Sequence, residues 1–272
     1  MVPRTLKLQP EPVDDPNDRR VADFFRLSDP VLRRQVEAAG DGFFVAEGAL
    51  VIRQLLASPY PLRAVLVTTQ GLAALGEELA GVDAPVYLVS QALMSAVTGF
   101  HFHRGALASA ARLPPPALST VVAGADLVLM AEGVTDNENL GALFRNAAAF
   151  GVGAVVLDAT TADPLYRRSV RVSMGQVLRL PHARVPDAAG AIAQLQGLGY
   201  EVLALTPVAG AEDVRSVRPR PMQVLLVGAE GPGLTEPALR AADRRVRIAM
   251  AAGVDSLNVA TAAAVALHHL AR

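Results

Sequence analysis

The 272-residue sequence contains no cysteine and no tryptophan, and aromatic residues make up only 4% of it. The absence of cysteine excludes disulfides, zinc–cysteine sites and thiol nucleophiles, and it favours a cytoplasmic location. The sequence has no uninterrupted apolar run of the roughly 18 residues that a transmembrane helix requires. Its first twenty residues are polar and lack the apolar stretch of a secretory signal. We therefore expect a cytoplasmic protein that does not span a membrane.

Neither sign of charge is in excess. Lys plus Arg number 25 and Asp plus Glu number 26, which gives a formal net charge of −1. This sum excludes a histone-like polycation and an acidic tail protein, so any site for a polyanion must be local. Lysine is nearly absent, since Lys7 is the only one. Codon bias in a GC-rich genome explains this preference for arginine, and the alternative explanation is bidentate recognition of phosphate, for which arginine is better suited than lysine.

Three consecutive prolines at residues 114–116 mark the clearest break in the chain. Such a run cannot lie inside a helix or a central strand, so residues 113–119 are predicted to form a linker. Before it, a flexible N-terminal arm at 1–24 and a small α/β domain at 25–112 are expected. The pattern in that domain predicts strands at 43–47, 64–68 and 86–90 and helices at 30–38, 49–57 and 72–79.

The sequence after the linker, residues 120–272, predicts a mostly parallel sheet that is covered by helices on both faces. Its continuous apolar runs are typical of buried parallel strands. They lie at 127–131, 154–157, 177–180, 202–205, 224–227 and 246–250. Ligands of such sheets bind beyond the carboxyl ends of the strands, which directs attention to the motifs that follow these runs.

The first such motif contains Asn139 and Arg145, at the start of a predicted helix at 140–150. The apolar residues of this helix form one stripe, and Arg145 lies on the opposite side. An alternative to a functional role is that Arg145 is solvated on an outer face and that Asn139 caps the helix.

The second motif, residues 228–234, carries three glycines and Glu230. Its G-x-x-G-x-G spacing is not the dinucleotide-binding fingerprint, and a tight turn with an incidental glutamate is the alternative to a ligand loop. The third motif contains Ser256 and Asn258 before a predicted helix at 259–272. Both residues are good helix caps, which is the alternative to a role in catalysis. The His268–His269 pair that follows is interpreted as a surface or interface feature rather than a metal site.

In their order and spacing, the three motifs resemble those of the SpoU/TrmH-type RNA 2′-O-ribose methyltransferases of the SPOUT superfamily. The resemblance covers residues 119–272 and extends more loosely over 25–112. There, Phe-Val-Ala-Glu-Gly at 44–48 resembles the F-x-x-E-G signature of an RNA substrate-binding domain similar to ribosomal proteins L30e and L7Ae. Two residues depart from the family pattern, since Ala249 replaces the usual proline and Ala229 stands where asparagine is common.

The resemblance implies an enzyme that transfers a methyl group from S-adenosylmethionine to a ribose 2′-hydroxyl of RNA. It implies an α/β catalytic domain whose sheet is flanked by helices and closed by a deep trefoil knot, a homodimer through this domain, and no metal ion. The implied cofactor-binding residues are Leu205, Thr206, Pro207, Gly228, Glu230, Gly231, Ile248, Met250 and Leu257. The implied catalytic residues are Asn139, Arg145, Glu230, Ser256 and Asn258.

The resemblance assigns Arg145 to activation of the 2′-hydroxyl. A guanidinium is almost always protonated and is a poor base, so its expected contribution is to bind the substrate phosphate and to stabilise the developing alkoxide. The other four catalytic residues would orient Arg145, the ribose and the loops through hydrogen bonds.

RNA contacts are expected from two local segments. Residues 163–184 contain five arginines and one aspartate, a net charge of +4 that suits phosphate contacts. The aromatic residues and histidines of 98–105 are expected to form a loop that stacks unpaired bases; the alternative is that its Phe side chains fill the core and its histidines are incidental. The predicted RNA-binding residues are His101, His103, Arg104, Arg167, Arg168, Arg171 and Ser173.

The sequence thus predicts a methyltransferase acting on structured rRNA or tRNA, with 23S rRNA slightly favoured. One alternative is a catalytically inactive RNA-binding protein of the same fold, which Ala249 supports. A Rossmann dinucleotide enzyme is disfavoured by the missing fingerprint.

Overall fold

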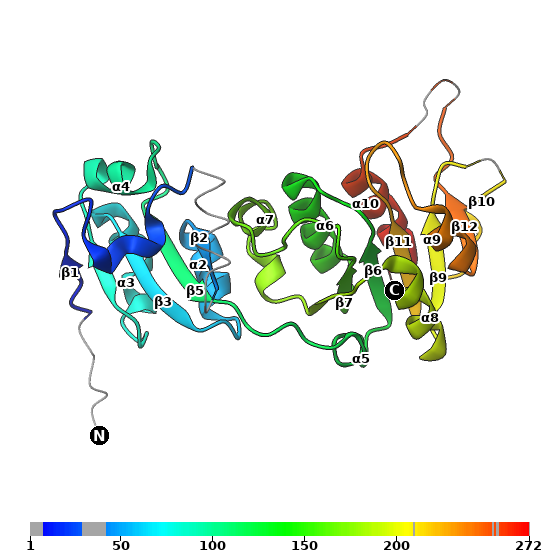
Figure 1. Ribbon diagram of the computed structural model, residues 1–272, viewed down its shortest axis with the longest axis horizontal. Helices are drawn as coiled ribbons and strands as arrows, with labels where there is room; N and C mark the ends of the chain where they lie inside the picture. Colours follow the sequence, from blue (N-terminus) through cyan, green and yellow to red (C-terminus); the bar gives the residue numbers. More distant parts are fainter. Residues whose placement is uncertain (1–7, 29–41, 209, 252, 254–255, 272) are drawn as a thin grey trace. The chain divides into compact units, whose positions relative to one another are not determined.

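The computed structural model describes residues 8–28, 42–208, 210–251, 253 and 256–271, which belong to two compact units (Figure 1). The first unit comprises Met1–Leu113 and Leu165–Arg171, and the second comprises Pro114–Pro164 and Val172–Arg272. The division after Leu113 coincides with the start of the predicted linker. The segment Leu165–Arg171, which the sequence analysis placed in the catalytic domain, is grouped with the first unit instead.

In the first unit, the described strands form a sheet in the order β1-β4-β3-β5-β2. The strands are β1 (Glu11–Pro12), β2 (Phe43–Glu47), β3 (Leu62–Val67), β4 (Val86–Leu88) and β5 (Ala106–Ala111), with helices η1 (Arg19–Phe24), α2 (Ala49–Leu56), α3 (Thr69–Leu79) and α4 (Gln91–Thr98). Strand β5 runs antiparallel to both β2 and β3. Helix α4 and strand β5 were not predicted from the sequence. The Ala-rich sequence of β5 lacks the β-branched residues that are typical of strands. The helix predicted at 30–38 lies outside the described residues.

The prediction of a flexible arm at 1–24 is wrong for residues 8–24, whereas residues 1–7 lie outside the described part of the chain. Strand β1 pairs in parallel with β4. Val13, Val21 and Phe24 are buried in the same core as Leu66 of β3. These apolar residues are too widely spaced to form a periodic pattern, so their burial depends on the tertiary structure and not on a local signal.

The second unit contains a sheet in the order β10-β12-β9-β11-β6-β7-β8, in which every recorded strand pair is parallel. Its strands are β6 (Leu127–Ala131), β7 (Ala154–Leu157), β8 (His182–Arg184), β9 (Glu201–Leu205), β10 (Glu212–Asp213), β11 (Gln223–Val227) and β12 (Arg244–Arg247). The helices are α5 (Leu118–Val121), α6 (Asn137–Ala149), α7 (Arg167–Val172, mostly in the first unit), η2 (Gln176–Leu178), α8 (Ala188–Gly197), η3 (Val214–Ser216), α9 (Glu236–Ala241) and α10 (Val259–Leu270). The prediction of a mostly parallel α/β sheet is therefore confirmed.

Helices cover both faces of this sheet. Alternate strand residues such as Val128 and Val224 pack in one cluster with side chains of α5, α8 and α9. Leu129 and Leu225 point to the opposite face, where they are completely buried as well. Burial on both faces explains why these strands read as continuous apolar runs.

One predicted strand, residues 177–180, is wrong. Met174 and Gly175 have positive φ angles of 55° and 79°, which turn the backbone into the single 3-10 turn η2. Val177 and Leu178 are buried in this turn, so the apolar run reflects burial and not strand geometry. The predicted strand at 246–250 is also displaced, since β12 ends at Arg247.

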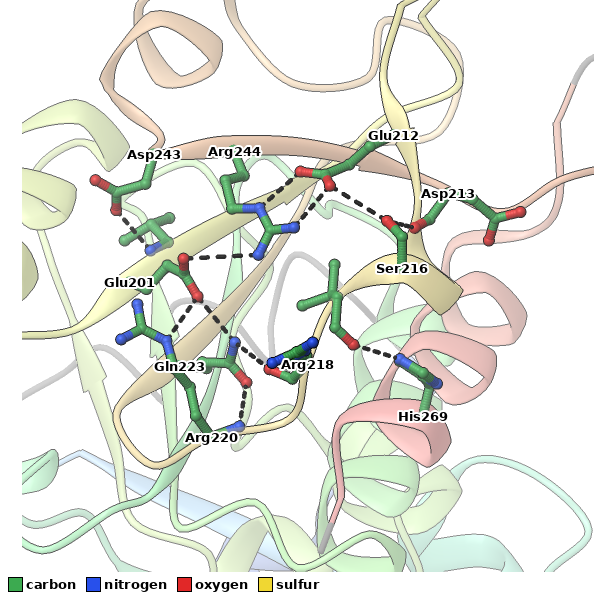
Figure 2. Close-up of polar contacts among 12 residues, drawn as sticks. Glu201, Glu212, Asp213, Ser216, Arg218, Arg220, Gln223, Asp243, Arg244 and His269 are labelled. Atoms are coloured by element: carbon green, nitrogen blue, oxygen red, sulfur yellow. Dashed lines mark hydrogen bonds and ion pairs between the residues drawn. The ribbon is translucent and has the colours of Figure 1, made fainter.

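A polar network stabilises the connecting segment between β9 and β11, residues 206–222, of which 209 lies outside the described part of the chain (Figure 2). Glu201, at the start of β9, accepts hydrogen bonds from Arg220 Nε (3.1 Å) and Gln223 Nε2 (2.9 Å). Arg244 of β12 lies 3.7 Å from Glu201 and donates two bonds of 2.6 Å to Glu212 of β10. These contacts fasten the strands on one side of the sheet at the ends remote from their C-terminal loops.

Helix α10 contacts the same connecting segment. His269 of α10 lies with its Nε2 2.9 Å from the carbonyl oxygen of Val217 (Figure 2). The interpretation of His268–His269 as a surface or interface feature holds for His268, which is exposed and packs edge-on against Phe150, whereas His269 is half-buried. None of the helices described in the structure has the length and apolar character needed to cross a membrane.

The network predicts acid sensitivity. Burial raises the pKa of Glu201, but hydrogen bonds from Arg220 and Gln223 and the charges of Arg220 and Arg244 outweigh it, so the pKa lies below its ordinary value. A carboxylate with a depressed folded-state pKa stabilises the protein above its unfolded pKa, and this contribution is lost as pH falls through the folded value. We expect Glu201→Gln to lower the free energy of unfolding near pH 7 by roughly 1 kcal/mol, because solvent screens the partly exposed arginines.

Thermal unfolding at a series of pH values tests this expectation. The difference between wild type and Glu201→Gln should shrink as pH falls below about 4, near the ordinary glutamate pKa. Glu236→Gln is the control, since Glu236 pairs with Arg240 on the exposed side of α9. A difference that stays constant down to acid pH would contradict the assignment.

Candidate active site

The three sequence motifs leave the same end of the sheet. Val227 at the end of β11 pairs with Ala131 at the end of β6, and Leu205 at the end of β9 pairs with Val246 of β12. Because β6, β11, β9 and β12 are successive parallel strands of the sheet, the loops after β6, β11 and β12, which carry the three motifs, begin along the same edge. This geometry brings residues that are about a hundred positions apart in the sequence into one site.

A side-chain amide connects all three motifs. Asn258 Nδ2 donates to Asn139 Oδ1 (2.7 Å) and to Glu230 Oε1 (2.8 Å). The Oδ1 of Asn258 caps α10 by accepting the backbone N–H groups of residues 260 and 261 at 3.0 and 3.1 Å. The cap fixes the orientation of the amide and so directs its Nδ2 toward the other two motifs. Asn258 is therefore both a helix cap and part of the candidate site.

Asn139 does not cap α6. Asp136 does so, because its Oδ1 accepts the N–H groups of Glu138 and Asn139 at 2.8 Å each. The side chain of Asn139, in the first helical turn, is thereby left for the contact with Asn258. The capping alternative for Asn139 is wrong.

A cavity of about 320 Å³ lies beside this cluster. All nine residues predicted to bind the cofactor line it, together with Ser256 and Asn258. The sequence analysis missed Val227, Ala229, Gly233, Val259 and Ala262, which also line it. Ala262 lies four residues after Asn258, on the same side of α10, so helical periodicity is the signal that finds it.

The glycine motif forms a tight turn that is also a wall of the cavity. A Cβ atom at Gly228 would lie 2.5 Å from the backbone nitrogen of Leu234. The turn is closed by a 3.1 Å hydrogen bond from Gly233 N to Ala229 O, with φ angles of 86° at Gly231 and 73° at Gly233. The tight turn is confirmed, and the same turn lines the cavity, whereas binding of a ligand by this loop stays a prediction.

Two buried carboxylates fasten the loop after β6. Glu132 accepts the backbone N–H (2.9 Å) and the hydroxyl (2.7 Å) of Thr235, which caps α9. On the other side, Asp158 after β7 accepts the N–H groups of Gly133 (3.0 Å) and Thr161 (2.9 Å). The sequence analysis missed both residues; the available signal is an acidic residue directly after a buried strand.

Asp158 is ionised as a consequence of these contacts. Burial raises its pKa, but hydrogen bonds from Gly133, Thr160 and Thr161 outweigh burial and hold the pKa below its ordinary value. Arg184 closes the same loop by donating to the carbonyl oxygens of Asp158 (2.9 Å) and Thr161 (2.8 Å). Arg184, which contributed to the predicted +4 segment, is therefore a structural residue.

Arg145 is not brought into the cluster. It lies on the exposed side of α6, where it lines a separate shallow hollow with Ala148, Ala149, Met174 and Gln176. Three of the five predicted catalytic residues, Glu230, Ser256 and Asn258, thus line the cavity, and Asn139 contacts Asn258. Arg145 faces solvent, as its position opposite the apolar stripe predicts.

Comparison with known proteins identifies the family. The model of the SpoU rRNA methylase family matches residues 126–268. An uncharacterized tRNA/rRNA methyltransferase of Mycobacterium tuberculosis is 48% identical over 269 residues, which are 97% of this chain and 93% of that relative. The chain belongs to the SpoU rRNA methylase family. The predicted resemblance is confirmed, while the L30e-like nature of the first unit stays a prediction.

Two further RNA methyltransferases are similar to this chain. A crystal structure of an rRNA methyltransferase from Sinorhizobium meliloti, with bound S-adenosylmethionine, has a TM-score of 0.79 and 27% identity over 96% of this chain and 97% of that chain. The 23S rRNA (guanosine-2′-O-)-methyltransferase RlmB of Bordetella pertussis is 35% identical over 152 residues, 56% of this chain and 62% of that protein.

The predicted RNA loop of this SpoU family member has an apolar and a polar side. Phe102 is buried and packs edge-on against Phe100, with ring centroids 5.9 Å apart. His101, His103 and Arg104 are exposed, and the two imidazole rings lie 4.1 Å apart. The alternative that the aromatic residues fill the core is therefore correct for Phe102, while the basic side chains face solvent.

The predicted RNA-binding residues around α7 differ in exposure. Arg168 is exposed, whereas Arg167 and Arg171 form ion pairs with the buried Glu47. Ser173 is completely buried, which removes it from the residues that can contact RNA. Among the described residues, no group of three His, Asp or Glu side chains is placed to hold a metal ion.

Gly228→Ala tests the geometry of the cavity. The added methyl would collide with the backbone at Gly233–Leu234, so the turn must shift. Overpacking of this kind typically costs about 1–3 kcal/mol. We expect the affinity for S-adenosylmethionine to fall roughly 10- to 100-fold, measured by calorimetry. Gly197→Ala is the matched control, because a Cβ there meets nothing within 4 Å. Equal affinities of both variants would refute this account of the turn.

Proposed function

We propose that this SpoU family member transfers the methyl group of S-adenosylmethionine to a ribose 2′-hydroxyl of RNA. The observation that carries the proposal is the contact of Asn258 with Asn139 and Glu230 beside a single cavity. Three motifs from three strand ends meet there, which a chain using each motif only as a cap or turn would not require.

The cavity fits the cofactor in shape and charge. Its walls are mostly backbone and apolar side chains, including Leu205, Ile248 and Leu257, which suit the adenine ring and the methionine chain. At Gly228 a Cβ atom would collide with the backbone of Gly233 and Leu234, so the cavity wall keeps its shape only with glycine there. Glu230 is the one charged residue among those found to line the cavity, and its carboxylate complements a positively charged sulfonium.

The cofactor, when bound, supplies an electrophilic methyl carbon. The protein must hold a ribose hydroxyl in line with it and favour loss of the hydroxyl proton. The mutual hydrogen bonds of Asn139, Glu230 and Asn258 keep these polar groups in fixed positions, and Ser256 adds a hydroxyl at the same rim. Preorganised groups of this kind lower the barrier because they need not reorient during the reaction.

Arg145 serves the substrate side of the reaction. Its permanently charged guanidinium binds the phosphate next to the target ribose and stabilises the alkoxide as it develops. Since Arg145 lines a separate hollow, the complete site requires a second element to be brought to it. We propose that this element is a second copy of the chain, in a homodimer through the catalytic domain.

The RNA is proposed to be structured rRNA or tRNA. The family and the 35% identical RlmB sequence favour 23S rRNA. His101, His103, Arg104 and Arg168 are exposed and are retained as RNA contacts. The trefoil knot and the cytoplasmic location stay predictions, and part of the segment between β12 and α10 lies outside the described residues.

Arg145→Ala tests the catalytic assignment. Removal of a charge-stabilising group typically costs about 10²–10³-fold in rate, and we expect such a loss of labelled-methyl transfer to rRNA. The affinity for S-adenosylmethionine should be unchanged, because Arg145 does not line the cofactor cavity. Arg240→Ala, which removes an exposed arginine of α9, is the control. Full activity of Arg145→Ala would assign the role to a different catalytic residue, whereas absence of transfer by the wild-type protein would favour the inactive RNA-binding alternative.

The homodimer is tested by mass in solution at micromolar concentration. Val265 is 44% exposed on the Ala-rich helix α10, an unusual position for an apolar residue unless another surface covers it. We expect Val265→Asp to convert a dimer into a monomer and to abolish methyl transfer. Leu198→Asp, at an equally exposed residue after α8, should leave the dimer intact. A monomeric wild-type protein would overturn this part of the proposal.

A further inference from the structure

A buried carboxylate in the first unit binds two arginines of one short helix. Glu47, the last residue of β2, is 2% exposed. Its Oε1 accepts a hydrogen bond from Arg167, and its Oε2 lies 3.3 Å from Arg171 Nη1. The two arginines are four residues apart on α7 and therefore project from the same face of the helix. One carboxylate thus fastens two successive turns of α7.

Arg167 is held from two further directions. Its Nη2 donates to the carbonyl oxygen of Leu27 at 3.4 Å, and its guanidinium lies 5.1 Å from the ring centroid of Phe100. Phe100 belongs to the loop that carries the RNA contacts proposed above. On the same side, a Cβ atom at Gly48 would lie 3.5 Å from Arg104 Cδ, so Arg104 passes close to the end of β2.

In the sequence, the same helix connects two strands of the second unit's sheet. It lies between β7 and β8, and the chain enters the first unit at Leu165 and leaves it after Arg171. Three residues after Arg171 comes Met174, which lines the hollow of Arg145 together with Gln176. A very short stretch of chain therefore joins the partners of Glu47 to the surroundings of the proposed catalytic arginine.

We propose that Glu47 is a positioning residue, which anchors α7 in the first unit and, through Arg167 and Phe100, holds the loop that carries the proposed RNA contacts. The effect on RNA binding rests on the proposed function, whereas the anchoring does not. Glu47 is a nearly inaccessible carboxylate that pairs with two guanidiniums. Removal of its charge is strongly destabilising, because it leaves two poorly solvated cations without their counter-ion. This role also explains why Arg167 and Arg171, although in the most basic part of the sequence, are only 18% and 29% exposed.

Hydrogen exchange of the full-length protein tests the anchor without any assay of activity. In Glu47→Gln, we expect peptides covering residues 165–172 to exchange at least about tenfold faster than in wild type, while peptides around the cofactor cavity are unchanged. Glu78→Gln is the matched control, since Glu78 pairs with Arg53 in the same unit but is 36% exposed. Unchanged protection of α7, or faster exchange throughout the chain, would overturn the proposal.

A double-mutant cycle guards against a general loss of stability in Glu47→Gln. The effects of Glu47→Gln and Arg171→Gln on exchange of α7 should be strongly non-additive, because both remove the same ion pair. Arg53→Gln, which removes the separate ion pair with Glu78 in the same unit, should combine additively with Glu47→Gln. Additivity in both cycles would contradict the anchor.

Steady-state kinetics test the consequence for the substrate. With in vitro transcribed 23S rRNA, we expect Glu47→Gln to raise KM for RNA about tenfold while the affinity for S-adenosylmethionine stays the same. Loss of a residue that only stabilised the fold would weaken the binding of RNA and of S-adenosylmethionine alike. An unchanged KM would reject the effect on RNA binding, even if exchange supports the anchor. If the wild-type protein methylates no RNA, the proposed function fails, and the exchange experiment still decides the anchor.

Discussion

The parallel pairing of β6, β11 and β9 is the constraint on which the site depends. Parallel neighbours lie about 4.8 Å apart and end on the same side of the sheet, so the loops after Ala131, Leu205 and Val227 must begin next to one another. Strands β6 and β11 are buried throughout and β9 is buried between its end residues, so their backbone groups need partners within the sheet. The chemistry of the site can therefore reside in the loops, because the sheet alone determines where they start.

The loops are then held by groups that can only accept hydrogen bonds. Glu132 and Asp158 follow neighbouring strands, and each bonds backbone N–H groups of the next loop. An ionised carboxylate offers several acceptor positions, which suits loops whose N–H groups have no strand partner. Asn258 differs because an amide both accepts and donates, so it can cap α10 and still reach Asn139. The carboxylates thus hold the loops in place, whereas the amide of Asn258 connects the three motifs.

Local patterns predicted most of the buried strands and the three motifs, and the family resemblance implied nine residues that all line the cavity. They failed where a feature depends on distant residues. The apolar run at 177–180 has the same composition as a strand, but the preceding positive φ angles make it a 3-10 turn. Glu47 and Arg167 are 120 positions apart, and no periodicity or motif announces their ion pair. A helical wheel placed Arg145 on an outer face but could not say what that face meets.

The preference for arginine has a structural consequence that the net charge conceals. A guanidinium has five donors in a planar fork, so it can pair with a carboxylate and donate to a carbonyl oxygen at once. Arg53 does so with Glu78 and Ala74, and Arg167 with Glu47 and Leu27. Arginines engaged in this way are withdrawn from phosphate binding, so a count of basic residues overstates the charge that RNA meets. Recognition must then depend on a few exposed cations and on how firmly the fold aligns them.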